Sequence, residues 1–223
     1  MSIKENLIHI KAQIGEKATL VAVSKTKPNE DIMEAYEAGQ RIFGENKVQE
    51  LAAKYESLPK DIEWHMIGHL QSNKVKYIAP FVQLLHGVDS EKLLKVVHKE
   101  GVKCDRKIPC LLQVHIAEEE TKFGFSEDEL VQLLTDELIE SVSHVDICGL
   151  MGMATNTDDE GQIRKEFGHL KLIFKNLKKT VFTNQESFKE ISMGMSGDFE
   201  IAMEEGSTMV RVGSSIFGYR NYH

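Results

Sequence analysis

Short apolar runs alternate along this chain with longer segments in which apolar residues recur every three or four positions. The short runs have the pattern of buried strands, and the longer segments have the pattern of amphipathic helices. A helix that carries Ile3, Leu7, Ile10 and Ile14 on one face comes first. Eight strands are then expected, at 20–23, 41–44, 63–68, 82–88, 109–116, 145–151, 191–193 and 208–212.

Helices fill the intervals between these strands, and several of them have recognisable ends. Ser126 and Glu129 have the spacing of a capping box before one helix that carries the leucines from Leu130 to Leu138. Further helices are expected over 44–55, 71–78 and 158–177. Three more are predicted to begin at a polar cap and to end at a glycine, with the pairs Asn29 and Gly39, Ser90 and Gly101, and Asp198 and Gly206.

The regular alternation of strands and helices predicts the fold class. Repeating units of about 20 to 30 residues favour a parallel α/β sheet, and eight such units match a closed (β/α)8 TIM barrel with an extra N-terminal helix. An open, doubly wound sheet is the alternative. No linker or low-complexity tract interrupts residues 1–223, so we predict a single domain.

Charge and cysteine content restrict the partners and the location. The 27 Lys and Arg residues against 35 Asp and Glu residues give a net charge of -8, which opposes attraction to nucleic acid or an anionic membrane. We expect neither partner, and no apolar run is long enough to span a bilayer. Cys104, Cys110 and Cys148 form no CxxC pair, and no secretory segment precedes the first strand. These features predict a cytoplasmic protein.

Lys25 is the first residue with candidate chemistry. It follows the apolar run at 20–23 and precedes the turn residues up to Pro28. In a parallel α/β fold, ligands bind at the carboxyl ends of the strands. Partial burial there lowers the proton affinity of a lysine and makes it a Schiff-base nucleophile. The alternative for a single lysine is a solvated surface charge.

Two loops rich in glycine and serine follow the last two predicted strands. Gly194, Ser196 and Gly197 follow the seventh strand, and Gly213 and Ser214 follow the eighth. In a TIM barrel these two loops commonly build a phosphate site. Glycines allow close approach of the backbone, and hydroxyl and N–H groups bind oxyanions. Turn formation alone is the alternative, but both loops fall at the expected places.

A strand-end lysine that faces a phosphate site meets the requirements of pyridoxal 5′-phosphate (PLP), which offers an aldehyde and a phosphate. Arg211 on the eighth strand would lie beside this site. Because arginine can only donate hydrogen bonds, it keeps a pyridine nitrogen unprotonated and weakens the ring as an electron sink. A salt bridge is the alternative role for Arg211.

Seven segments of the sequence resemble, in the same order, motifs of the pyridoxal phosphate homeostasis proteins, the YggS/PROSC family. They are LVAVSKTKP, FGENKVQE, WHMIGHLQSNK, ETKFGF, GLMGM, ISMGMSGDFEIAMEEGST and VRVGSSIFG. The resemblance covers nearly the whole chain. It implies the fold of the N-terminal barrel domain of alanine racemase.

The same resemblance implies a function and a set of site residues. The family binds and supplies PLP and keeps vitamin B6 and amino-acid pools in balance, without an established reaction of its own. PLP-dependent apoenzymes are the implied recipients, and we expect a monomer or a weak dimer. The resemblance places the cofactor as a Schiff base on Lys25, the phosphate on Ser196, Gly197, Gly213 and Ser214, the pyridine nitrogen at Arg211, and Asn46 and His65 along the pocket.

Three positions near these motifs need separate mention. Ser214 stands where the family more often has threonine, and the change retains the hydroxyl. His115 stands where an asparagine is expected. Lys122 is a second loop lysine that could receive or relay the aldehyde, the alternative being a surface charge.

Three other functions are open to the sequence. A PLP-dependent racemase or decarboxylase needs acid and base groups on both faces of the substrate carbon. In alanine racemase a second domain and the partner subunit help to supply one face, and the end of this chain soon after the last strand disfavours efficient turnover. A metal-dependent hydrolase would use His65 and His69, but their strand context and the missing further ligands disfavour it. An interaction protein would use the apolar face of the first helix.

Overall fold

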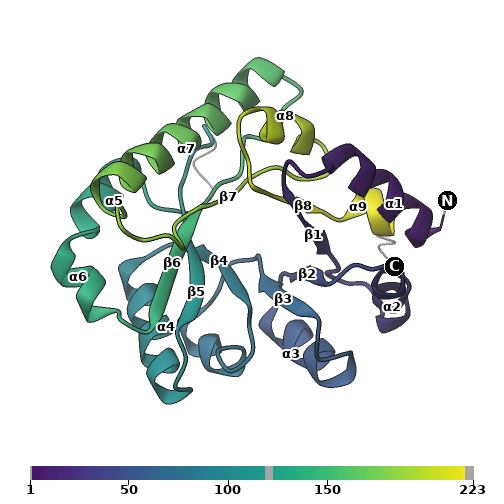
Figure 1. Ribbon diagram of the computed structural model, residues 1–223, viewed down its shortest axis with the longest axis horizontal. Coiled ribbons are helices and arrows are strands. Elements are labelled where there is room, and N and C mark those ends of the chain that lie inside the picture. The colour runs from purple at the N-terminus through teal and green to yellow at the C-terminus, as the bar shows by residue number, and fades with distance from the viewer. Residues whose placement is uncertain (1, 119–122, 219–223) are drawn as a thin grey trace.

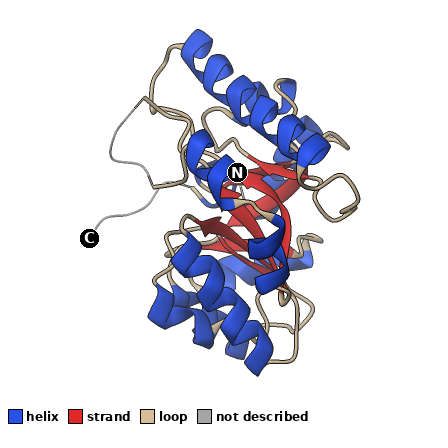
Figure 2. Ribbon diagram, turned by 90° about the vertical axis from the view of Figure 1, so that its left-hand side faces the viewer, coloured by secondary structure: helices blue, strands red, loops and turns tan. Residues whose placement is uncertain are grey.

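Eight parallel strands close into a barrel in the computed structural model (Figure 1). The structure describes residues 2–118 and 123–218. The strands follow one another around the barrel in chain order, and β8 (Met209–Val212) pairs with β1 (Thr19–Val23) to close the sheet. Helices surround the strands in the side view (Figure 2). The predicted (β/α)8 barrel is confirmed, and the open-sheet alternative is wrong.

The elements match the predicted pattern closely. The other strands are β2 (Ile42–Glu45), β3 (Glu63–Met66), β4 (Leu84–Val88), β5 (Ile108–Gln113), β6 (Val145–Met151) and β7 (Glu190–Ser192). The helices are α1 (Ile3–Ile14), α2 (Asn29–Glu37), α3 (Val48–Ser57), the 3-10 helix η1 (Ser72–Tyr77), α4 (Glu91–Lys103), α5 (Glu127–Leu133), α6 (Asp136–Ser141), α7 (Glu160–Thr180), α8 (Phe199–Glu204) and α9 (Ser214–Phe217).

Two apolar cores lie on the two faces of the barrel sheet. The larger one fills the space between the strands and the surrounding helices and includes Phe43 and Trp64. Successive side chains of a strand point to opposite faces, so these strands are apolar on both sides. The smaller core fills the barrel interior and consists of Val21, Leu84, Leu111, Met151 and Met209.

A buried polar layer lies on the inner face of the barrel, next to the inner apolar core. It contains His86, Gln113 and Arg211, each two positions after a member of that core, together with His65 and Ser192. A step of two residues along a strand returns to the same face. The polar layer therefore lies nearer the carboxyl ends of the strands than the apolar core does.

The N-terminal helix α1 packs on the outside of the barrel. Leu7, Ile10 and Ile14 of its apolar face are buried. The Asn6 side-chain amide donates a hydrogen bond of 3.0 Å to the carbonyl of Ile216 in α9, and Figure 1 shows these two helices together. The apolar face that an interaction protein would offer is thus used by the chain itself.

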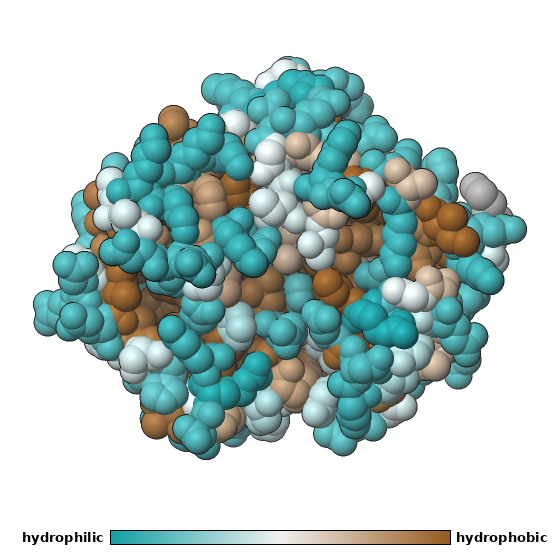
Figure 3. Space-filling model, in the orientation of Figure 1, coloured by the Kyte–Doolittle hydropathy of each residue, from teal (hydrophilic) through white to brown (hydrophobic). Residues whose placement is uncertain are grey.

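The face drawn in Figure 3 is mainly hydrophilic, and apolar residues show between the hydrophilic side chains and at the rim. Within residues 2–118 and 123–218, no helix combines the length and the apolar character that crossing a membrane requires.

One helix end differs from its prediction because of close packing. Ser90 caps α4 as predicted, but the helix continues past Gly101 to Lys103. A Cβ atom on Gly101 would lie 2.8 Å from the carbonyl oxygen of His144. The glycine therefore lets α4 approach the segment before β6 and does not end the helix.

The leucine-rich segment after Ser126 forms two helices where one is predicted. Ser126 and Glu129 form the predicted capping box of α5. Leu134 leaves the helical conformation with ψ of 65°, and the Thr135 hydroxyl then accepts the N–H of Leu138 and caps α6. A second N-cap inside the apolar pattern divides the segment.

Two predicted helix caps are also wrong in detail. Asn29 lies inside α2, and Pro28 occupies the N-cap position. Asp198 stands at the N-cap of α8, but its carboxylate accepts the N–H of Met195 at 2.5 Å and makes no capping hydrogen bond. It therefore closes the loop that precedes α8.

Candidate functional site

The turn after β1 holds Lys25 at the carboxyl end of the barrel. The N–H of Lys27 donates to the carbonyl of Ser24 at 3.0 Å, and Lys25 between them is half-buried. Thr26 has a φ of 66°, in the left-handed region that β-branched residues rarely adopt. Its N–H donates to the Glu50 carboxylate at 2.6 Å, which stabilises this conformation.

A buried ion-pair cluster of Glu45, Glu50 and Lys54 packs against this turn. The Lys54 ammonium donates to the Ser24 carbonyl at 2.9 Å, to Glu45 at 2.8 Å and to Glu50 at 2.7 Å. The Ser24 hydroxyl donates to Glu45 at 2.6 Å. Burial raises the pKa of the Glu45 carboxyl, and Lys54 and Ser24 oppose that effect. The cluster holds the backbone on both sides of Lys25.

The loops after β7 and β8 meet at the same end of the barrel. The N–H of Gly213 donates to the Ser196 hydroxyl at 3.2 Å. A Cβ atom on Gly213 would lie 3.1 Å from the carbonyl oxygen of Val23, so the glycine lets this loop pass close to β1. The Lys27 ammonium donates to the Phe217 carbonyl at 2.7 Å and joins the turn after β1 to α9.

The remaining expected loop residues are exposed around these contacts. Ser214 is the first residue of α9, where backbone N–H groups have no acceptor within the helix. Gly197 has open space where a side chain would begin. Asn46 follows β2, and a Cβ atom on Gly68 would lie 2.6 Å from its Oδ1 atom. Hydroxyl, amide and backbone N–H groups are therefore concentrated at this end.

A continuous row of buried polar groups crosses the barrel interior from β8 to β3. Arg211 donates through Nη1 to the Ser192 hydroxyl at 2.5 Å. Ser192 Oγ lies 2.9 Å from Nδ1 of His86, and His86 Nε2 lies 3.0 Å from Nδ1 of His65. Burial lowers the pKa of His65 to about 3 and lowers that of His86 well below its usual value. Both rings are neutral at pH 7.

Arg211 places a positive charge in the barrel interior. Its Nη2 atom donates to the Gly152 carbonyl at 3.2 Å, and among the described residues no carboxylate forms an ion pair with it. Burial lowers its pKa to about 10, opposed by the charge of Asp198, so the guanidinium stays protonated at neutral pH. The salt-bridge alternative is not found in this part of the chain. A buried guanidinium whose hydrogen bonds to the described residues go only to the Ser192 and Gly152 oxygens can donate to a further acceptor.

Mild acid should destabilise the protein through His65 and His86. Both bind protons less readily in the folded chain than at the ordinary histidine pKa of 6.5. As the pH falls below 6.5, the unfolded chain therefore takes up more protons. Each histidine should lower the free energy of unfolding by about 1.4 kcal/mol per pH unit. The positive charge of the neighbouring Arg211 also lowers the pKa of His86.

Urea denaturation at pH 7.5, 6.5 and 5.5 checks this prediction. The loss of stability should begin below pH 6.5 and should be about halved in a His86→Gln variant. His9 is exposed, so His9→Gln should leave the pH dependence unchanged. Equal pH dependence in the His86→Gln variant and the original chain would contradict the assignment.

Two further residues that the sequence analysis singled out, His115 and Lys122, do not belong to this row of polar groups. His115 follows β5, and its backbone N–H donates to the Phe125 carbonyl at 2.9 Å. Lys122, the expected second loop lysine, lies outside the described residues.

The histidine pair of the metal hypothesis is not brought together. His65 contacts His86 inside the barrel, whereas His69 faces outward and pairs with Asp89 at 3.1 Å. Over the described ranges of the chain, no three His, Cys, Asp or Glu side chains gather in a way that could hold a metal ion.

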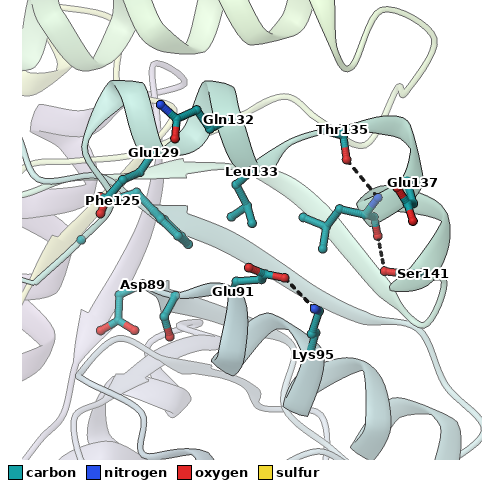
Figure 4. Close-up of a pocket in the computed structure, with 13 residues that line it drawn as sticks. Asp89, Glu91, Lys95, Phe125, Glu129, Gln132, Leu133, Thr135, Glu137 and Ser141 are labelled. Carbon is teal, nitrogen blue, oxygen red and sulfur yellow. Dashed lines mark hydrogen bonds and ion pairs between the residues drawn. The ribbon is translucent and has the colours of Figure 1, made fainter.

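A separate groove of about 790 Å³ lies between α4, α5 and α6 (Figure 4). Phe125, Leu133 and Leu138 form apolar parts of its wall. At its edge, Glu91 pairs with Lys95 at 2.6 Å. The acidic residues that line it are Asp89, Glu91, Glu129 and Glu137. None of the residues expected to bind PLP lines this groove.

Sequence reasoning missed the residues that support the expected ones. Lys54, Glu45, His86 and Ser192 are all buried. A polar residue inside an apolar run, such as His86 in LLHGV, is a signal that a buried partner is required. The sequence does not identify that partner, because it lies on another strand or helix.

Comparisons with known proteins agree with the fold. The family described as alanine racemase, N-terminal domain, matches residues 1–221. A relative from Vibrio alginolyticus named pyridoxal phosphate homeostasis protein is 38% identical over 236 residues and covers 99% of this chain and 99% of its own. One of the same name from Aquifex aeolicus is 38% identical and covers 92% of this chain and 88% of its own.

Solved structures extend the comparison. PipY of Synechococcus elongatus without PLP is 35% identical with a TM-score of 0.91, over 97% of this chain and 100% of that chain. PipY with PLP bound is 34% identical with a TM-score of 0.88, over the same shares. Alanine racemase from Bartonella henselae shares the fold at 16% identity, with a TM-score of 0.74 over 98% of this chain and 60% of that chain. This chain therefore belongs to the alanine racemase N-terminal domain family and, within it, to the pyridoxal phosphate homeostasis proteins.

Proposed function

We propose that this chain binds PLP as a Schiff base on Lys25 and serves PLP, vitamin B6 and amino-acid homeostasis. Relatives that are 38% identical bear the name pyridoxal phosphate homeostasis protein, and PipY, at 34% identity, has been solved with PLP bound. PLP-dependent apoenzymes are the proposed recipients of the cofactor. The proposed location is the cytoplasm, which Cys104, Cys110 and Cys148 fit because they form no disulfide.

The observation that carries the proposal is the buried Arg211 in the barrel interior, whose backbone N–H donates to the carbonyl of Gly194 in the loop that carries Ser196. PLP offers a matching set of groups, because its pyridine nitrogen accepts a hydrogen bond and its phosphate accepts several. When bound, the cofactor supplies an aldehyde that condenses reversibly with amines. The proposed assignments are Lys25 for the aldehyde, Arg211 for the pyridine nitrogen, Ser196, Gly197, Gly213 and Ser214 for the phosphate, and Asn46 and His65 for the pocket wall.

Arg211 also supports a binding role over a catalytic one. Its guanidinium donates hydrogen bonds and keeps its own proton at neutral pH. It therefore does not protonate a pyridine nitrogen, and the ring remains a weak electron sink. Slow amino-acid racemisation or decarboxylation is the second candidate, favoured by the fold shared with alanine racemase. A turnover screen with amino acids at saturating PLP distinguishes the two, since a binding protein should show no turnover above the rate of PLP in solution.

Borohydride reduction tests the central assignment. The protein is incubated with PLP, its absorption spectrum is recorded, and the Schiff base is reduced and mapped by peptide mass spectrometry. One adduct on the peptide that contains Lys25 is expected. Label spread over exposed lysines, or found only on Lys122, would contradict the proposal.

The phosphate contacts should contribute more to PLP retention than Arg211 does. Ser196→Ala combined with Ser214→Ala removes two hydroxyl donors from the proposed phosphate site, where hydrogen bonds to a charged group are each worth about 1.5 to 3 kcal/mol. We expect roughly hundredfold or greater weakening, since each 1.4 kcal/mol is a factor of ten, and this loss should exceed the effect of Arg211→Ala. Equilibrium dialysis of PLP against each variant measures this, with the exposed Ser143→Ala as control. A larger loss in Arg211→Ala would contradict the order.

A further inference from the structure

The buried row from Arg211 to His65 has a hydrogen-bond direction that its chemistry determines. A guanidinium has no acceptor, so Arg211 donates to Ser192 Oγ at 2.5 Å. Ser192 is fully buried, and its only other side-chain partner among the described residues is His86 Nδ1 at 2.9 Å. If His86 donated to Ser192, the serine proton would be left without an acceptor inside the barrel. The Ser192 hydroxyl therefore donates to His86 Nδ1.

The direction continues to the far end of the row. A neutral imidazole that accepts at Nδ1 carries its proton on Nε2. His86 Nε2 therefore donates to His65 Nδ1 at 3.0 Å, and His65 in turn carries its proton on Nε2. This requires both rings to be neutral, which burial ensures by lowering the pKa of each. Within the described chain, His65 Nε2 has no hydrogen-bond partner and is not among the fully buried unsatisfied atoms. It therefore borders open space.

We propose that Ser192 and His86 are positioning residues that form a one-way relay from Arg211 and fix His65 as a hydrogen-bond donor at Nε2. The relay orients Arg211 at one end, because Ser192 and Gly152 hold its two terminal nitrogens. At the other end it determines which ligand atom fits against His65, since only an acceptor is compatible with that N–H. The relay is a property of the ligand-free chain, and only its consequence for a bound molecule rests on the proposed function.

Nitrogen-15 NMR of the ligand-free protein at pH 7 tests the relay. Correlations between the ring nitrogens and the carbon-bound ring protons distinguish the two neutral tautomers and the charged form. His65 and His86 should both be neutral with the proton on Nε2. A proton on Nδ1 of either ring, or a charged ring, would overturn the proposal on the original chain alone.

Two variants separate a relay from simple packing. Ser192→Ala removes the hydroxyl that donates to His86 Nδ1, so the Nδ1 signal of His86 should shift. The Nδ1 signal of His65 should shift as well, although Ser192 does not contact His65. His86→Gln keeps an amide N–H in reach of His65 Nδ1, so His65 should retain its proton on Nε2. The exposed His9 is the internal control and should not change. Unchanged histidine signals in a folded Ser192→Ala protein would contradict the relay.

Addition of PLP tests the consequence for the ligand. The Nε2–H signal of His65 should move as the site fills. If a Lys25 adduct forms while this signal stays constant, His65 does not face the ligand, although the Lys25 assignment stands. If neither change occurs while the tautomers are as expected, the relay stands and the proposed function fails.

Discussion

Replacement of Lys25 by alanine is expected to abolish the absorption band of protein-bound PLP and the borohydride-stable adduct. The reason is the loss of the only amine proposed to meet the aldehyde. The two neighbouring amines have structural roles, because Lys27 donates to the Phe217 carbonyl and Lys54 donates to Glu45 and Glu50. Neither can take the place of Lys25 without breaking the contacts that hold the site.

Spectra and peptide mass measurements after reduction give the readout for this variant. Lys25→Arg keeps the positive charge but has no nucleophilic amine, so it should behave as Lys25→Ala does. Lys17 is exposed, and Lys17→Ala should retain the full band. A Lys25→Ala protein with an unaltered spectrum and an unaltered PLP content would refute the assignment.

The second large effect is expected from Lys54→Met, which should lower the free energy of unfolding by about 3 to 5 kcal/mol. Removal of one partner from a buried ion pair leaves the other charge uncompensated. Here Lys54 is the partner of Glu45, which is fully buried and has one oxygen, Oε2, without a hydrogen bond to the described residues. The Ser24 carbonyl also loses its contact with the ammonium.

Urea denaturation at neutral pH measures the loss. Lys95→Met is the matched control, because Lys95 pairs with Glu91 four residues away on an exposed helix face. Such a surface pair contributes at most about 1 kcal/mol. The double variant Glu45→Gln with Lys54→Met should recover part of the lost stability, since it removes the second charge. Similar losses in Lys54→Met and Lys95→Met would show that the buried cluster does not stabilise the turn after β1.

The sequence pattern predicted the strands, most helices and the closed barrel, because strand and helix periodicity is a local property. The predictions were wrong at positions where a local sequence signal conflicts with the packing of the folded chain. The sequence predicts a helix end at Gly101, but this residue lies inside α4, where the carbonyl of His144 leaves no room for a Cβ atom. The sequence pattern places Thr135 inside one leucine-rich helix, but its side chain caps the N-terminus of α6.

The candidate site was predictable only in part. The lysine turn and the two glycine- and serine-rich loops follow from local motifs placed on a TIM barrel, and the resemblance to a family supplied Asn46 and His65. The supporting contacts are not local. Lys54 reaches Ser24 from a position 30 residues away, and Ser192 reaches His86 across 106 residues. Such pairs require the three-dimensional arrangement of the strands.

The pairing of β1 with β8 has a consequence for biosynthesis. Lys25 leaves the ribosome well before β8, the strand that pairs with β1, and before Gly213 and Ser214. Contacts so distant along the chain form late in folding. A nascent chain should therefore display the amine proposed to bind the aldehyde before the proposed phosphate site can form, so cofactor retention is expected only after β8 has emerged.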